Sequence, residues 1–144
     1  RRHPDDPTMT ITRINPPDLP ELPGVAHVVI SEGLRTVHVA GQAPVDRTGA
    51  LVGGDDLEAQ AAAAFSNLGH ALAAVGAGPA EVVRTVIYVA DYRPHDLDAV
   101  VAGALRAFGD LVPNACTLLG VQALFHEGQR IEVDAVAALP EAAP

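Results

Sequence analysis

The sequence contains no lysine, no tryptophan and a single cysteine, Cys116. Without lysine the chain has no residue for a Schiff base, for the phosphate-binding lysine of a P-loop or for a lysine general base. One cysteine can form neither an internal disulfide nor a cysteine-based metal cluster, which fits a reducing compartment, so we expect a cytoplasmic protein. The six histidines have no metal-ligand spacing and no GxGxxG motif is present, so we predict neither a metal nor another cofactor.

Positive charge is also scarce. All nine basic residues are arginine, and 18 acidic residues give a net charge of −9. A nucleic-acid backbone requires concentrated positive charge, so we expect no nucleic-acid partner. The uncharged apolar stretches fall well short of the roughly 18 residues that span a bilayer, so we expect no membrane partner either. A small molecule or another protein is the expected partner.

The length of 144 residues fits one domain. Residues 1–14 are interpreted as a tag remnant or a disordered N-terminus, because the segment Arg1–Thr8 carries charge and proline without periodicity. Residues 15–139 are predicted to form the single domain, which begins with an extended proline-rich segment, and residues 140–144 are predicted to form a C-terminal tail.

Hydrophobic periodicity predicts strands and helices in the order β-β-α-β-α-β-β. The predicted elements are a hairpin of strands at 26–30 and 36–40, a helix from Asp55 to about Val75, a strand at 82–89, a helix from Asp96 to about Gly109, and strands at 116–121 and 130–138. We expect an α+β fold in which both helices cover one face of a mixed sheet. In the strand at 82–89, β-branched residues occur at both odd and even positions and so lie on both faces. This indicates that the other face of the sheet is covered as well, by a partner subunit or by barrel-like closure.

The last predicted strand holds the most informative polar residues. Side chains alternate along a strand, so Glu132 and Asp134 share one face while Ile131, Val133 and Ala135 share the other. Two readings are open: a solvent-facing strand, or a carboxylate that acts as a general acid or base. Cys116 is interpreted as a small buried hydrophobe, with nucleophilic catalysis as a less favoured alternative.

Four segments resemble the RidA/YjgF family. They are HVAGQAPV at 38–45, the helix start at Asp56–Gln60 with Asn67–Leu68 after it, VVRTVIYVAD at 82–91 and IEVDAVA at 131–137. The resemblance implies a chorismate-mutase-like fold and a homotrimer whose sheets form an inner barrel with clefts between subunits. It also implies hydrolysis of reactive imines and enamines to a keto acid and ammonia. Some relatives are called endoribonucleases, an activity that the negative charge of this chain disfavours.

Of the residues that the family uses for this chemistry, the glutamate is retained in this sequence and the others are replaced. The family's water-activating glutamate corresponds to Glu132. The arginine that holds the substrate carboxylate corresponds to Cys116, counting back from Leu124, with Thr117 at the following serine. The family's Ser-Gly-Gln serine corresponds to Ala40, and His27 is the polar candidate for its tyrosine.

A thiol cannot replace a bidentate arginine–carboxylate contact. With Leu118 also in its lining, the cleft is predicted to be more apolar than the family's and to accept a larger or uncharged ligand. The sequence thus predicts a divergent hydrolase or deaminase for imines, enamines or related small metabolites that uses Glu132. The alternative is a non-catalytic trimer that binds a small ligand or regulates a partner.

Overall fold

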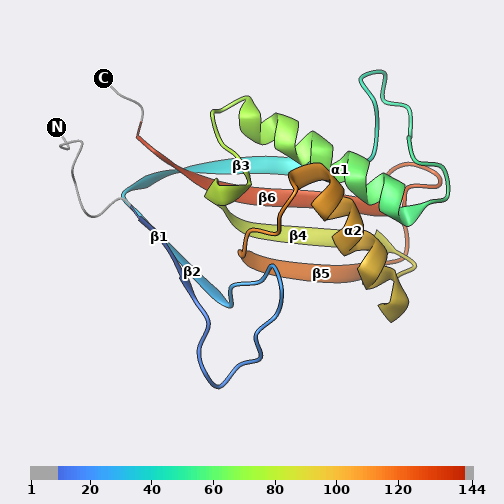
Figure 1. The fold of residues 1–144 in the computed structure, drawn as a ribbon. Helices are drawn as coiled ribbons and strands as arrows, with labels where there is room; N and C mark the ends of the chain where they lie inside the picture. Colours follow the sequence, from blue (N-terminus) through green and yellow to red (C-terminus); the bar gives the residue numbers. More distant parts are fainter. Residues whose placement is uncertain (1–9, 142–144) are drawn as a thin grey trace.

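Four strands form the main sheet in the computed structural model, which describes residues 10–141 (Figure 1). Their order across the sheet is β3 (Leu34–Gln42), β6 (Ile131–Pro140), β4 (Val82–Ala90) and β5 (Ala115–Val121). The pairs β3–β6 and β4–β6 are antiparallel, whereas β4 and β5 run parallel. The parallel pair requires a crossover, and helix α2 provides it. The sheet is therefore mixed, as predicted.

Both long helices lie on one face of this sheet (Figure 1). Helix α1 spans Leu57–Ala73 and α2 spans Leu97–Phe108, and short 3₁₀ turns η1 (Pro79–Glu81) and η2 (Pro94–Asp96) precede β4 and α2. Asp56, one residue later than predicted, caps α1 by accepting a 3.2 Å hydrogen bond from the Ala59 amide. The predicted α+β arrangement with two helices on one face is confirmed.

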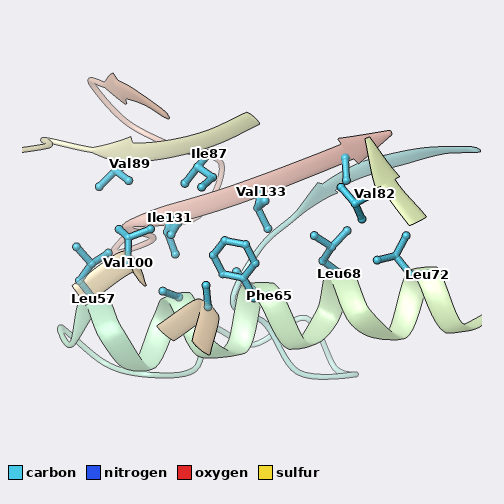
Figure 2. Packing of buried hydrophobic residues seen from close by; sticks show 14 of the residues in the cluster. Leu57, Phe65, Leu68, Leu72, Val82, Ile87, Val89, Val100, Ile131 and Val133 are labelled. Carbon is cyan, nitrogen blue, oxygen red and sulfur yellow. The ribbon is translucent and has the colours of Figure 1, made fainter. Parts of the chain in front are cut away.

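The core lies between the helices and this face of the sheet. Figure 2 shows Phe65 and Leu68 of α1 packed toward Val133 of β6 and Ile87 of β4, all of them buried. Phe65 also meets Phe108 of α2 edge to face, with 5.6 Å between the ring centroids. Since every second residue of β4 and β6 points into this core, the residues between them point to the opposite face of the sheet.

The N-terminal region differs from the prediction. Thr10–Ile14 form strand β1, which pairs antiparallel with β2 (Val28–Glu32) in a separate two-stranded sheet. The predicted hairpin of strands at 26–30 and 36–40, which correspond to β2 and β3, is therefore wrong, because β2 pairs with β1 and β3 pairs with β6. Figure 1 shows the β1–β2 pair projecting from the main sheet.

Residues 10–14 were expected to belong to a disordered N-terminus, but side-chain contacts hold β1 in place. Arg13 donates hydrogen bonds to the carbonyl oxygens of Pro113 at 2.6 Å and Ala80 at 2.8 Å. Arg1–Thr8, interpreted as a tag remnant, lies outside the described residues. At the other end the predicted tail starts one residue too early, because Pro140 is the last residue of β6 and pairs with Leu34.

Candidate functional site

Glu132 and Asp134 lie on the sheet face that the helices do not cover, which we call the open face. Both side chains are half-buried, whereas Ile131, Val133 and Ala135 between them are buried in the core. The predicted alternation is therefore confirmed. Along a strand, alternate residues are about 7 Å apart, so the two carboxylates form a local concentration of negative charge.

Tyr88 of β4 joins this pair of carboxylates. It is the direct cross-strand partner of Glu132, yet its hydroxyl donates a 2.9 Å hydrogen bond diagonally to Oδ2 of Asp134. This bond, with desolvation and the charges of Asp134 and Glu132 as smaller causes, raises the pKa of the Tyr88 phenol. Tyr88 therefore acts as a hydrogen-bond donor that fixes Asp134. The sequence VVRTVIYVAD could have indicated this position, because Tyr88 alternates with the buried residues of the strand and therefore points to the face opposite to the core.

A bulge in β3 brings the main chain close to Glu132. The register of β3 on β6 shifts between Val39 and Gln42, and Gly41 lies within the shifted stretch. A Cβ atom on residue 41 would lie 2.8 Å from Cδ of Glu132, so the carboxylate packs against bare backbone. The residue before Gly41 is the exposed Ala40, whose side chain is only a methyl group.

Two amide side chains of α1, the buried Gln60 and the half-buried Asn67, hold the segments that carry these groups. Gln60 donates to the carbonyl oxygens of Gly54 and Gly128 and accepts from the backbone N–H of Arg130, two residues before Glu132. Asn67 donates to the carbonyl oxygens of Ala43 and Val45, just after Gly41. These amides therefore position the start of β6 and the end of β3.

Arg84 adds a positive charge to the open face. It is exposed and pairs in register with Val136 on one side and with Ala115 on the other. Four residues along a strand span about 13 Å, so Arg84 lies at the opposite end of this surface from Tyr88. The open face thus carries a guanidinium at one end and carboxylates toward the other.

Cys116 and Leu118 do not lie on the open face. They pair with Thr85 and Ile87, pack against the core and line a cavity between α2 and the sheet. Within one chain, Cys116 and Leu118 therefore lie on the sheet face opposite to Glu132, because the pleat turns them toward the helices. Their place in a cleft between subunits stays a prediction. The β5 residues on the open face are Ala115, Thr117 and Leu119, so Thr117 is the one predicted β5 residue that shares the face of Glu132.

His27 is also engaged elsewhere. Its ring Nε2 lies 2.7 Å from the carbonyl oxygen of Pro20, and its backbone N–H donates to Oδ1 of Asn15. Both partners lie in the connection between β1 and β2, and His27 immediately precedes β2. Within one chain, His27 therefore orders this connection, and the structure does not bring it together with Glu132.

The arrangement suits proton transfer. A half-buried carboxylate, a second carboxylate held by a phenol and an exposed guanidinium can together bind a polar molecule and move a proton. Within residues 10–141, no group of three or more histidine, cysteine or acidic side chains is placed to hold a metal ion. Neither α1 nor α2, the long helices of the described part of the chain, has the length and apolar character needed to span a membrane.

Comparison with known proteins agrees with this fold. The family model "Endoribonuclease L-PSP" matches residues 26–139. The Rid family protein YyfB from Yersinia pestis is 39% identical, with 91% of this chain and all of that chain covered and a TM-score of 0.83. A YjgF/YER057c/UK114 family member from Mycobacterium tuberculosis is 28% identical over 90% of this chain and all of its own, with a TM-score of 0.57. No curated protein matches. The chain therefore belongs to the Rid/YjgF family, which the endoribonuclease L-PSP model describes.

Proposed function

We propose that the protein hydrolyses imines, enamines or related small metabolites on its open sheet face, with Glu132 as the general base. Family membership supports a role in small-metabolite hydrolysis, deamination or binding in general. The observation that carries the proposal is the contact between Glu132 and Gly41, which places the carboxylate against bare backbone beside an exposed surface.

In the proposed reaction, Glu132 accepts a proton from water as the water oxygen bonds to the carbon of the C=N group. The protonated carboxyl returns that proton to nitrogen, and the resulting carbinolamine loses ammonia as its hydroxyl becomes a carbonyl. One imine and one water thereby give one carbonyl compound and one ammonia. No redox partner or metal is required.

We propose that a homotrimer completes this site. Val86 and Val136 are half-buried on the open face, and Leu119 there is 44% exposed. An apolar sheet face of this kind is usually covered. Neighbouring copies would cover it and form clefts between subunits, with His27, Cys116 and Leu118 available only from the side of another chain. We propose a cytoplasmic location and a small-molecule ligand.

The absence of arginine from positions 115 and 116 bears on the substrate. The family's arginine has no counterpart at the start of β5, and the nearest guanidinium on the open face is that of Arg84, one strand away. This observation supports a substrate larger than a simple imino acid, or an uncharged one. It also keeps a second candidate function in place, namely a trimer that binds a ligand without turning it over.

Ammonia release from a panel of imines generated in situ tests the proposal. General acid–base catalysis contributes about 10²–10⁴-fold, so Glu132→Gln is expected to lower the rate by at least about 100-fold. Glu127→Gln is the matched control, because Glu127 is an exposed carboxylate in the loop before β6. Equal rates for the wild type and Glu132→Gln would overturn the catalytic proposal. Calorimetric binding of panel members without any ammonia release would favour the binding protein.

A further inference from the structure

Arg84 is an exposed arginine in a strand that lies between two others. Its register partners are Val136 of β6 and Ala115 of β5, and neither can balance its charge. The carboxylate diagonal to it, that of Asp134, already accepts the hydrogen bond of Tyr88. Among residues 10–141, the Arg84 guanidinium has no ion-pair partner. It is therefore available to an anion from solution.

The neighbours of Arg84 in its row across the open face carry no negative charge. His38 of β3 is exposed and pairs in register with Val136, so it lies two strand spacings, or about 10 Å, from Arg84. Thr117 of β5 is half-buried and diagonal to Arg84, because it pairs with Val86. Imidazole and hydroxyl groups can both donate hydrogen bonds. This part of the open face, which we call the basic end, therefore presents donors from three strands.

The single guanidinium of the basic end indicates which anion it would bind. One guanidinium matches one planar carboxylate, which it can hold by two parallel hydrogen bonds. A phosphate group with two negative charges requires more positive charge than one arginine supplies, and the chain as a whole has a net charge of −9. The basic end therefore favours a carboxylate.

The basic end is distant from Glu132. Arg84 and Tyr88 are four residues apart on β4, which is about 13 Å, and Tyr88 is the register partner of Glu132. Side chains stand roughly perpendicular to a sheet, so this separation is largely kept at the surface. A molecule that contacts both Glu132 and Arg84 must therefore have several atoms between the two contacting groups.

We propose that the substrate is an imine whose carboxylate is separated from its C=N group by several carbon atoms, and that Arg84 binds this carboxylate. The proposal rests on the proposed hydrolysis at Glu132 for the reacting end of the molecule and on Arg84 for the other end. Hydrolysis would release ammonia and an oxo acid with its carbonyl and carboxylate groups far apart. Arg84 thereby determines specificity and takes no part in proton transfer.

Two isomeric oxo acids test the proposal on the full chain. 6-Oxoheptanoate carries its carboxylate far from the ketone, 2-oxoheptanoate carries it on the neighbouring carbon, and heptan-2-one has no carboxylate. We expect calorimetry to show at least tenfold tighter binding of 6-oxoheptanoate than of the other two compounds. Equal binding of the two isomers, or no binding of 6-oxoheptanoate, would overturn the proposal.

Substitutions of two arginines locate the bound carboxylate. Arg84→Gln removes the charge and is expected to weaken binding of 6-oxoheptanoate at least tenfold, with no change for 2-oxoheptanoate. Arg106→Gln is the matched control, because Arg106 lies on α2, across the sheet from the open face, and pairs with Glu58. This control is expected to bind both isomers as the wild type does. Equal effects of the two substitutions would contradict the proposal.

Kinetics separate carboxylate binding from the reaction. For the imine generated in situ by oxidation of 6-aminoheptanoate, Arg84→Gln is expected to raise KM at least tenfold and to leave kcat within twofold, because Arg84 does not touch the reacting carbon. A lower kcat at unchanged KM would overturn the role of Arg84. Binding of 6-oxoheptanoate that depends on Arg84, without any ammonia release, would support the carboxylate site and overturn the proposed hydrolysis.

A neighbouring copy of the chain is the competing partner for Arg84. In that case Arg84→Gln changes the oligomeric state measured by light scattering, and the wild type does not distinguish the isomers, which would overturn the proposal. If Arg84→Gln does not fold, the wild-type protein decides the question. Its preference for 6-oxoheptanoate is then expected to fall as salt is added, because salt screens an exposed ion pair, and a preference independent of salt would count against Arg84.

Discussion

Gly41 of β3 and Glu132 of β6 are in such close contact that a Cβ atom on residue 41 would lie 2.8 Å from Cδ and 3.0 Å from Oε2 of Glu132. Gly41 is not among the glycines with positive φ, so the position requires its lack of a side chain rather than its conformational freedom. The residue at position 41 therefore determines where the Glu132 carboxylate can lie.

Gly41→Ala is expected to reduce imine hydrolysis at least tenfold with little loss of stability. The added methyl group displaces the Glu132 carboxylate, and the half-buried side chain can move toward the open face to make room. Ammonia release and thermal unfolding measure the two effects. Gly78→Ala is the matched control, because a Cβ there meets its nearest atom at an ordinary 3.5 Å. Full activity in Gly41→Ala would show that this contact does not position the carboxylate.

Arginine substitutions at adjacent positions test the assignment of β5 residues to the two faces. Ala115→Arg directs the guanidinium to the open face beside Arg84, so we expect the protein to fold and to bind carboxylate-bearing ligands more tightly. Cys116→Arg directs it into the apolar space under α2, at a cost of about 2 kcal/mol or more. Chemical denaturation and calorimetric binding compare the two variants. Greater destabilisation by Ala115→Arg than by Cys116→Arg would contradict the assignment.

The hydrogen bond from Tyr88 to Asp134 predicts how the phenol titrates. The pKa of Tyr88 is raised, so this bond stabilises the fold at pH values below the ordinary tyrosine pKa of about 10 and loses its effect as the pH rises through the folded-state value. Asp134→Asn is expected to lower the pKa of Tyr88 toward the ordinary value. Tyrosinate absorbance follows the titration, because the chain has two tyrosines and no tryptophan.

Tyr92→Phe, introduced into both the wild type and Asp134→Asn, leaves Tyr88 as the single tyrosine that contributes to the tyrosinate absorbance. An unchanged midpoint in Asp134→Asn would show that the carboxylate does not control this phenol. The titration must be read below the alkaline unfolding transition, which circular dichroism locates for each variant.

Two glycines in the helices make opposite predictions for stability. A Cβ on Gly103 of α2 would lie 2.4 Å from Cβ of Ala61 and 2.7 Å from the backbone nitrogen of Ala62, so Gly103→Ala must push the helices apart and is expected to cost about 3 kcal/mol. A Cβ on Gly69 of α1 would meet only the ring edge of Phe108, at 3.3 Å. Gly69→Ala is therefore expected to stabilise the protein by up to about 1 kcal/mol, because alanine has the higher helix propensity. Denaturant unfolding measures both. Equal stabilities of the two variants would contradict the close approach of the helices.

Local patterns account for the parts of the fold that the sequence predicted. The apolar spacing of three and four residues in α1 and the strict alternation of β6 each require one structure and one buried face. The face shared by Glu132 and Asp134 followed from that alternation alone. For β5, by contrast, the family correspondence placed Cys116 in a cleft without assigning it to a face of the sheet. The structure turns Cys116 toward the helices, and a shift of one residue along a strand would exchange the two faces.

Composition and periodicity by themselves determined the α+β class, the order of the elements from β2 to β6 and the carboxylates of β6. Tertiary structure alone decided that β1 forms and pairs with β2, that β3 pairs with β6, and that Gly41 touches Glu132 while Tyr88 holds Asp134. The physical reason is the separation along the chain of the residues that interact. Periodicity reflects which side of one segment is buried, whereas pairing and contact join residues that are distant along the chain and depend on how all the segments pack together.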